Sequence, residues 1–576
     1  MRTPWLLLAI ALGAFGCAVS PPAAKRPNVI VIMTDDQGFG DLGCLGNPIL
    51  DTPAIDRLAA ESVRFDDFYV SPVCAPTRAS LMTGRYCYRT RAIDTWVGRA
   101  MMEPDEVTLA EVLRAAGYRT GIFGKWHLGD CYPMRAIDQG FDEALVHRGG
   151  GLAQPSEPLE NARRYTDPIL FHNGEAVQTE GYCTDLYFDA AIDFVRRAGA
   201  APFFVYLPTN APHTPLHDVP AELLAKYTAR DIASLLPEGA KHTEATARVF
   251  AMIDNIDQNV GRLLATLDES GLADDTIIVY LHDNGPQQPR WNRGLRGTKG
   301  TVYEGGIRSP LFVRWPGHLR PADVDGVAAA HVDVLPTVLD LAQVLPPLGV
   351  AIDGRSLRPL LEGDASAWPA RDLVLQVHRG DVPVRGHHVA VIGPQFKLVH
   401  PTGFGRETPP DDVAWELYDL VADPGEAHDV AAAQPEVVAR MRAVYDAWFD
   451  DVSSTRPDNY APPRIVLGTD REIETALTHQ DWRRRGDQGW GEHGRWLLRF
   501  VGGHRYDVRA LLQRPLAVTA ATLVVGARRW RQEIAATTAE FTFADVEIAD
   551  GDAELEIEIE HEGGTAAPYQ VIVTRQ

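Results

Sequence analysis

The sequence predicts an α/β fold in which a mainly parallel sheet is covered by helices on both faces, followed by a smaller α+β subdomain and an all-β C-terminal module. Three observations predict this architecture. Short β-branched, apolar runs alternate with helical patterns up to about residue 365, as the strand–helix–strand units of a parallel sheet require. Shorter strand patterns and one long helix follow. Beyond about residue 481 only strand patterns remain, which is typical of antiparallel β structure.

The first unit, residues 25–365, contains five apolar runs that predict buried strands. They are short and bounded by polar residues or proline, as strands covered on both faces are. The expected strands cover residues 28–33, 119–123, 202–207, 276–281 and 310–315. Helical spacing of apolar residues predicts helices at residues 52–62, 108–116, 245–267 and 334–341.

The rest of the chain predicts two smaller units, residues 366–480 and residues 481–576. The expected elements of the first are strands at 388–392 and 396–399 and a helix at 435–449. Those of the second are strands at 495–501, 521–525, 540–548 and 555–560. Apolar residues alternate with glutamates from Leu555 to Glu560, so we expect one face of that strand to be buried and the other to be exposed to solvent. We expect a small β-sandwich.

The aromatic residues of the last unit have two interpretations. Trp490, Trp496 and Trp530 could line a sugar-binding surface. A structural role in the core is the commoner use of such side chains, and we favour it.

The N-terminus predicts export to the periplasm or the cell exterior. Arg2 precedes an apolar run at residues 5–15, which is too short to span a bilayer but fits the centre of a secretory signal. Cys17 is a candidate for the lipidated cysteine of a bacterial lipoprotein, although the residues before it fit that motif poorly. The sequence is consistent with a lipid-anchored protein and with a freely soluble one. Residues 1–24 are thus expected to be a signal peptide and tether.

Composition excludes one class of partner. The 576 residues are long enough for two to four domains. The formal net charge of −23 argues against nucleic acid, because a phosphate backbone is bound through an excess of Lys and Arg.

Four cysteines are open to disulfide formation in an oxidising compartment, Cys44, Cys87, Cys131 and Cys183. Three pairings are consistent with the sequence. The sequence contains no Cys-x-x-Cys pair of the kind that would indicate a zinc site.

Polar residues follow four of the expected strands. They are Asp35 and Asp36, Lys125 and His127, His213, and Asp283 and Asn284. Ligands of open α/β sheets bind beyond the carboxyl ends of the strands. We therefore expect these side chains to share one rim of the sheet.

One motif narrows the function. Residues 74–85 are CAPTRASLMTGR, and this stretch resembles the signature of the type I sulfatases of the alkaline phosphatase superfamily. The resemblance extends from residue 28 to about residue 450 and includes the piece ELYDLVADPGEAHDV at residues 416–430. It implies an alkaline phosphatase-like fold and oxidation of Cys74 to formylglycine by a maturating enzyme. Thr77 stands where the family usually has serine.

The resemblance implies one calcium ion. Its ligands would be Asp35, Asp36, Asp283 and Asn284, together with the group at position 74. Such an all-oxygen set suits a hard cation and lacks the histidines or thiolates that favour zinc. His282 replaces the usual Ser or Thr of the family before Asp283, and we do not expect it to be a ligand.

The resemblance also implies catalytic roles. Lys125 and His127 occur in GKWHLG, His213 in NAPHTPLH and Lys299 in RGTKGTVYEGGIR. Arg78, Lys125 and Lys299 would surround the sulfate, and Asp283 would deprotonate the nucleophile. His213 or Lys299 would protonate the leaving alcohol, and His127 would assist release of sulfate. If residues 125–127 are extended, Lys125 and His127 point to the same side; His217 does not match and is expected to be structural.

We therefore predict a sulfuric ester hydrolase acting on a sulfated carbohydrate, with a small aryl sulfate as an artificial substrate. Two alternatives stay open. One is a phosphonate or phosphate ester hydrolase of the same superfamily. The other is an inactive sulfatase-like binding protein that acts through its C-terminal module.

Overall fold

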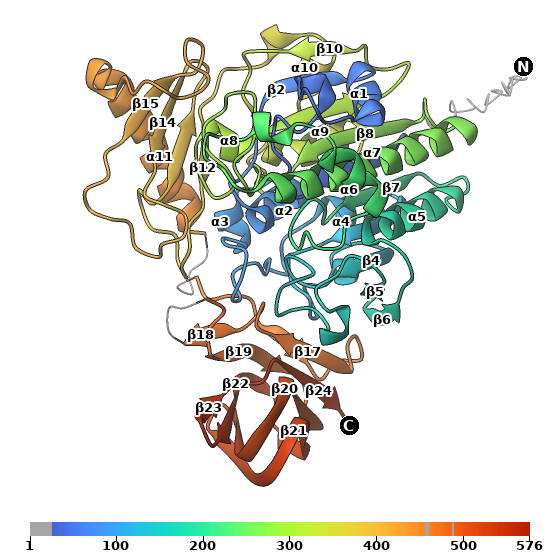
Figure 1. The fold of residues 1–576 in the computed structure, drawn as a ribbon, viewed down its shortest axis with the longest axis vertical. Coiled ribbons are helices and arrows are strands. Elements are labelled where there is room, and N and C mark those ends of the chain that lie inside the picture. The colour runs from blue at the N-terminus through green and yellow to red at the C-terminus, as the bar shows by residue number, and fades with distance from the viewer. Residues whose placement is uncertain (1–25, 456–459, 486–488) are drawn as a thin grey trace, which may run out of the picture.

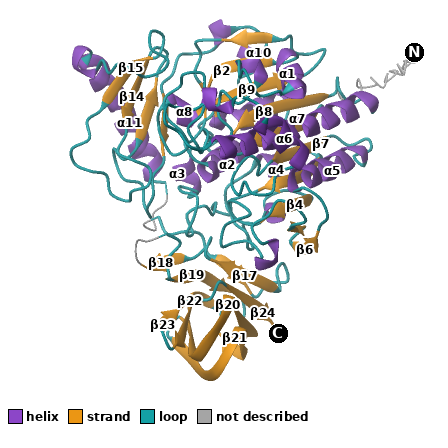
Figure 2. Ribbon diagram, viewed as in Figure 1, coloured by secondary structure: helices purple, strands orange, loops and turns teal. Residues whose placement is uncertain are grey.

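The computed structural model describes residues 26–455, 460–485 and 489–576. These residues form three sheets, of eleven, four and nine strands (Figures 1 and 2). The signal-peptide and lipid-anchor predictions concern residues 1–24, which lie outside this description. Within the described ranges, no helix combines the length and the hydropathy needed to cross a bilayer.

The central sheet is mixed, with a parallel middle. Its strands are β1 (Asn28–Thr34), β2 (Val63–Tyr69), β3 (Arg119–Lys125), β4 (Glu143–His147), β5 (Ile169–His172), β6 (Glu175–Gln178), β7 (Phe203–Pro208), β8 (Thr276–His282), β9 (Arg308–Arg314), β10 (Ala322–Val324) and β11 (Ala329–Ala330). Their order is β10-β2-β9-β8-β1-β7-β3-β4-β5-β6, with β11 beside β2. The run from β8 to β4 is parallel. β9 is antiparallel to both neighbours, because no long crossover helix separates it from β8.

Helices cover both faces of this sheet, as predicted (Figure 2). The helices before β12 are α1 (Pro53–Ala60), α2 (Cys74–Thr83), α3 (Cys87–Thr90), α4 (Leu109–Ala115), α5 (Cys183–Arg196), α6 (Ala221–Thr228), α7 (Thr243–Glu269), α8 (Glu304–Ile307), α9 (Val334–Leu341) and α10 (Arg358–Leu361). Val29 and Val31 of β1 pack with α2, α4 and α9. Ile30 and Ile32 face the other way and pack with α1, α5 and α7. The strand therefore alternates between two apolar layers.

A four-stranded antiparallel sheet follows, at the upper left of Figure 1. It comprises β12 (Leu373–Gln376), β13 (Val389–Ile392), β14 (Phe396–His400) and β15 (Glu416–Asp419), and α11 (Pro435–Ser453) covers it. Lys397 of β14 is fully buried, and its Nζ lies 2.8 Å from a Glu304 oxygen and 2.9 Å from a Glu426 oxygen. This buried triad joins the smaller sheet to α8.

The C-terminal module is one nine-stranded sheet that bends over its own core. Its strands are β16 (Ile465–Leu467), β17 (Glu474–Thr478), β18 (Arg483–Arg485), β19 (His493–Phe500), β20 (His504–Val525), β21 (Arg528–Ile548), β22 (Gly551–His561), β23 (Gly564–Ala566) and β24 (Gln570–Arg575). β20 pairs with β24 in its first half and with β22 in its second. The sheet starts before the expected boundary at 481, because β16 and β17 pair with β19 and β24. Trp496 is fully buried.

The cysteines open to disulfide formation are unpaired. Cys44, Cys87, Cys131 and Cys183 are all free thiols. Cys87 and Cys131 lie in separate apolar clusters, and Cys183 lies in a third. The disulfide pairings that the sequence permits are therefore absent from the described residues.

Candidate active site

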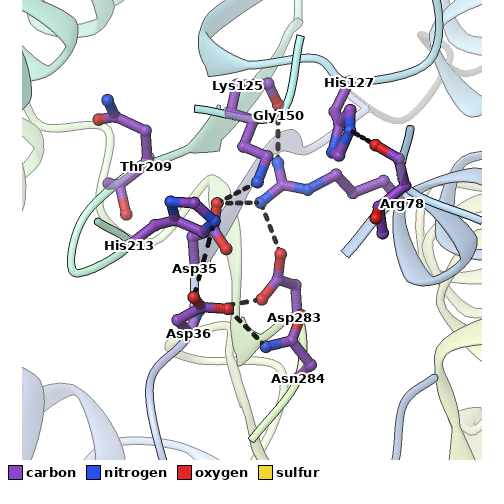
Figure 3. A network of polar contacts seen from close by, with 12 residues as sticks. Asp35, Asp36, Arg78, Lys125, His127, Gly150, Thr209, His213, Asp283 and Asn284 are labelled. Carbon is purple, nitrogen blue, oxygen red and sulfur yellow. Dashed lines mark hydrogen bonds and ion pairs between the residues drawn. The ribbon is translucent and has the colours of Figure 1, made fainter. Parts of the chain in front are cut away.

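The candidate active site lies where the parallel strands of the central sheet end (Figure 3). β1, β3, β7 and β8 are neighbours and run in one direction, so their carboxyl ends meet at one edge. Asp35 and Asp36 follow β1, and Lys125 ends β3. His213 lies in the loop after β7, and Asp283 directly follows β8. The structure therefore brings these side chains together at one edge of the sheet, where the sequence analysis expected them.

Cys74 is the first residue of α2 and is buried, with 2% of its surface exposed. Burial raises the pKa of its thiol, and the nearby Lys125 and Lys299 only partly oppose this. Pro76 is the third helical residue, a place where no intrahelical bond to its nitrogen is lost. Arg78 follows one turn after Cys74, on the same helix.

Arg78 and Lys125 are fully buried cations that bind the same carboxylate. Arg78 Nη2 lies 2.8 Å from Asp283 Oδ2 and 3.5 Å from Asp35 Oδ2. Lys125 Nζ lies 2.5 Å from Asp35 Oδ2. Arg78 Nη1 also donates to the Lys125 carbonyl, at 2.7 Å. Burial alone would raise the pKa of Asp35, but Lys125, His213 and Arg78 hold it well below its usual range.

Several oxygens of this cluster are buried without a donor. Among the described residues, Asp35 Oδ1, Asp36 Oδ2 and Asn284 Oδ1 have no hydrogen-bond partner. Asp35, Cys74 and Asp283 each offer an atom within 4.8 Å of the others, and so do Asp35, Asp36 and His213. Unpartnered carboxylate and amide oxygens are ligands that a hard cation prefers. The residues therefore fit the calcium site that the family resemblance implies.

Asp36 contacts the second pair of predicted residues. Lys299 Nζ lies 2.6 Å from its Oδ1, and His213 Nε2 lies 3.7 Å from its Oδ2. Asn284 Nδ2 donates to Asp36 Oδ1 at 2.8 Å. Burial lowers the pKa of His213 to about 4, with Asp36 opposing and Lys299 adding to the shift. Although burial opposes it, the Asp36 carboxylate raises the pKa of Lys299, which keeps its proton.

The tautomer of His127 follows from its contacts. His127 Nε2 lies 2.8 Å from the carbonyl oxygen of Thr95, so this nitrogen carries the hydrogen and donates it. Nδ1 is buried and has no partner among the described residues. Burial, Lys125 and Arg78 lower the pKa of His127 well below its usual range. Nδ1 is therefore an unprotonated nitrogen available to accept a proton.

Residues 125–127 do not have the fully extended conformation that the sequence analysis considered. The φ of His127 is +59°, which is left-handed. Lys125 and His127 still flank the same group, Arg78, in Figure 3. They meet because the chain turns after β3, and not because of strand alternation.

The structure adds residues that the motifs did not predict. A Cβ on Gly150 would lie 2.6 Å from His127 Cε1, and one on Gly151 would lie 3.0 Å from the His213 ring. The triplet Gly149–Gly150–Gly151 was a visible signal that could have been used. Gln480, from the C-terminal module, donates its Nε2 to the Thr95 carbonyl at 2.9 Å. No sequence pattern marked Gln480.

The remaining residues singled out in the sequence lie outside the reacting cluster. Thr77 Oγ1 donates to the Asp283 carbonyl at 2.8 Å. The threonine hydroxyl, at the position where the family usually has serine, therefore helps to hold Asp283 in place. His282 is buried and its Nε2 lies 3.2 Å from the Tyr280 hydroxyl. His217 is exposed.

Two family models match the chain. The model described as Sulfatase matches residues 27–344. The model described as N-sulphoglucosamine sulphohydrolase, C-terminal, matches residues 297–445. Neither reaches the C-terminal module.

Curated and solved relatives agree with these models. Human arylsulfatase A is 32% identical over 529 residues, which cover 81% of this chain and 95% of the human protein. N-acetylgalactosamine-6-sulfatase of Sus scrofa is 33% identical over 399 residues, 64% of this chain and 72% of that protein. The structure of Ps i-CgsB in complex with k-i-k-neocarrahexaose has a TM-score of 0.65 and 27% identity, covering 76% of this chain and 95% of that one. The first model covers more than half of the sequence, so the chain belongs to the sulfatase family of sulfuric ester hydrolases.

Proposed function

We propose that this protein is a calcium-dependent sulfatase that removes sulfate from a sulfated carbohydrate with a formylglycine made from Cys74. One observation carries the proposal. Three cations, Arg78, Lys125 and Lys299, gather with carboxylates at the start of the helix that begins at Cys74. A sulfate ester repels anionic nucleophiles until such cations neutralise its oxygens, and each donor of this kind contributes roughly 10²- to 10³-fold in rate.

Calcium would be held by Asp35, Asp36, Asp283 and Asn284. The buried, partner-free oxygens of three of these residues support the assignment. The ion would supply positive charge beside the sulfate oxygens and lower the cost of placing three carboxylates together. Removal of the ion would leave these carboxylates to repel one another.

Formylglycine at position 74, once hydrated, would supply a geminal diol, with one hydroxyl to attack sulfur and a second to let sulfate leave. The residues around it prepare this position. Lys125 and Lys299 add positive charge near Cys74. The N-cap residue of α2, Val73, makes no side-chain cap hydrogen bond, and free N–H groups at the start of a helix favour a bound anion.

Proton transfers are assigned by position and by proton affinity. Asp283 offers a carboxylate oxygen within 4.8 Å of Cys74 Sγ, so in its ionised form it would take the proton of the attacking hydroxyl. Lys299 keeps its proton and can give it to the leaving alcohol. His213 becomes a second donor when an anionic ester nearby raises its pKa. His127 Nδ1 accepts the proton of the second hydroxyl.

The relatives support a carbohydrate substrate. One is named for N-acetylgalactosamine-6-sulfate chemistry, and the solved structure of Ps i-CgsB contains a neocarrahexaose. The phosphonate or phosphate ester hydrolase stays as the second enzymatic candidate, because the same cations would bind a phosphoryl group. The inactive binding protein is disfavoured, since such a protein has no chemical need for the complete set of polar residues.

Two measurements test the function. Mass spectrometry of the Cys74 peptide should show the mass of formylglycine in place of cysteine. Purified, converted protein should release sulfate from a sulfated glycan and from an aryl sulfate far faster than it releases phosphate from the matching esters. Cys74→Ala, the matched control, should abolish turnover. A faster phosphate reaction, or full activity in Cys74→Ala, would overturn the proposal.

Export and domain boundaries belong to the same proposal. The protein would be secreted to the periplasm or beyond through residues 1–24, with Cys17 as the lipid-anchor candidate. A formylglycine-generating enzyme of the host would be its maturation partner. The units would be residues 25–365 for catalysis, 366–480 as the C-terminal sulfatase subdomain and 481–576 as the accessory module, whose sheet starts earlier, at β16.

A further inference from the structure

A cleft separates the catalytic unit from the C-terminal module. Its volume is about 450 Å³, within the roughly 300–1,000 Å³ that small-molecule sites occupy. One wall comes from the segment after β4, and the other from the module. The residues that line the cleft include Gln154, Leu159, Arg163, Trp490, Gln513 and Tyr569.

The cleft begins next to the candidate active site. Gln154, which lines it, accepts a hydrogen bond at Oε1 from the Gly150 amide at 2.9 Å. Gly150 lies against the ring of His127, and Gly151 lies against the ring of His213. The same segment therefore touches both histidines and then forms the wall of the cleft.

The exposed side chains of the cleft suit a saccharide. Trp490 is only partly buried, and its ring meets Trp96 edge-on at 5.3 Å, which holds it in place. An indole offers an apolar face to the C–H groups of a sugar ring. Gln513 is exposed, and its amide can donate to and accept from hydroxyls.

Charge adds a preference for acidic sugars. Arg163 and Glu157 are the two charged residues that line the cleft. Glu157 is buried, with 2% exposure, and lies 3.5 Å from His147. Arg163 is exposed. The charge presented to a ligand is therefore positive and can pair with a carboxylate or a second sulfate.

We propose that this cleft binds the saccharide chain that carries the scissile sulfate, an acidic oligosaccharide of two or more units. The inference rests on the proposed function and deepens it. The module would then be one wall of the substrate site, and not an independent binding domain. Neither matched family model reaches Trp490, Gln513 or Tyr569.

A substrate comparison tests the cleft. The double variant Arg163→Ala/Gln513→Ala and the single variant Trp490→Ala should each lower kcat/KM by about tenfold or more on a sulfated tetrasaccharide. Turnover of 4-nitrophenyl sulfate, which is too small to reach the cleft, should stay unchanged. Arg164→Ala is the matched control, because Arg164 is an exposed neighbour that does not line the cleft. The tetrasaccharide is the one that binds Cys74→Ala most tightly among a panel of sulfated glycosaminoglycan and carrageenan fragments.

Binding separates this inference from the proposed function. Calorimetric titration of the same tetrasaccharide into Cys74→Ala should give an affinity that falls about tenfold in the double variant. If converted protein hydrolyses neither substrate, the sulfatase assignment is wrong. The titration still measures whether the cleft binds the tetrasaccharide. If the cleft variants lose both substrates equally, or bind the tetrasaccharide as tightly as the parent, the inference is overturned.

Discussion

Two carboxylates of one cluster have opposite proton affinities. Lys125 Nζ lies 2.5 Å from an Asp35 carboxylate oxygen. Despite burial, the pKa of Asp35 lies well below the usual range. Asp283 has Arg78 as its cationic partner and lies beside Asp35, so burial and that neighbour raise its pKa to about 7. One residue is thus a permanent anion, and the other exchanges its proton near neutral pH.

This difference predicts how calcium affinity depends on pH. The proposed calcium ion would bind the ionised form of Asp283, so protons would compete with it below the pKa of about 7. The calcium Kd should fall by up to about tenfold for each unit of pH rise below that value and become constant above it. Titration calorimetry from pH 5 to pH 8.5 measures this.

Asp283→Asn is the control for that measurement. The variant cannot bind the competing proton, so its weaker calcium affinity should lose most of the dependence on pH. Equal affinity of the parent protein at pH 5.5 and pH 7.5 would contradict the assignment of Asp283 as the titrating ligand.

Among the elements, the glycine loop after β4 explains how two histidines are positioned without direct contact to each other. Gly150 and Gly151 let the backbone approach His127 and His213 more closely than any side chain would permit. The ring orientations therefore depend on a segment that carries no catalytic group.

Gly150→Ala should lower kcat by about tenfold to a hundredfold, because the added methyl group would lie 2.6 Å from His127 Cε1 and displace the ring. Steady-state kinetics with an aryl sulfate measures the effect. Gly405→Ala is the matched control, since a Cβ there meets nothing within 4 Å and its backbone needs no positive φ. Unchanged kcat in Gly150→Ala would show that the ring has room to move.

The elements also show what sequence could and could not predict. Apolar runs located β1, β3, β7, β8 and β9 and the helices α7 and α9 within a few residues, because buried elements in such a sheet carry continuous hydrophobic patterns. The direction of β9 was not encoded in any pattern, since strand direction depends on the connection. Motifs located Cys74, Lys125 and Asp283, whereas Gln480 carries no motif and reaches the site only through tertiary packing.

On the scale of the whole molecule, two contacts couple distant parts of the chain. The triad of Lys397, Glu304 and Glu426 joins the smaller sheet to the segment that carries Lys299. Gln480 joins the C-terminal module to the loop that orients His127. The four side chains that make these contacts are buried.

Lys397→Met should lower the free energy of unfolding by about 3–5 kcal/mol, because two buried glutamates would lose their shared counter-charge. Urea unfolding monitored by tryptophan fluorescence measures it. Adding Glu304→Gln and Glu426→Gln to this variant should recover part of the loss. An Lys397→Met protein as stable as the parent would show that the glutamates are neutral or solvated.

Gln480 is predicted to be a positioning residue for His127. Gln480→Glu keeps the shape of the side chain but cannot donate to the Thr95 carbonyl, so it should lower kcat about tenfold while KM changes less than twofold. Gln480→Ala should have a similar effect on kcat. Equal changes in kcat and KM, or a loss of melting temperature with normal kcat, would indicate a purely structural role.

The burial of Cys74 sets an order of events in the cell. Position 74 is 2% exposed, at the first turn of a helix enclosed by the central sheet, so no second protein can reach it once the chain has folded. Any host enzyme that oxidises this side chain must act during or just after translation, in competition with folding. If the proposed conversion of Cys74 is required for activity, faster production would yield a larger share of unconverted, inactive molecules, and slower synthesis would raise the active fraction.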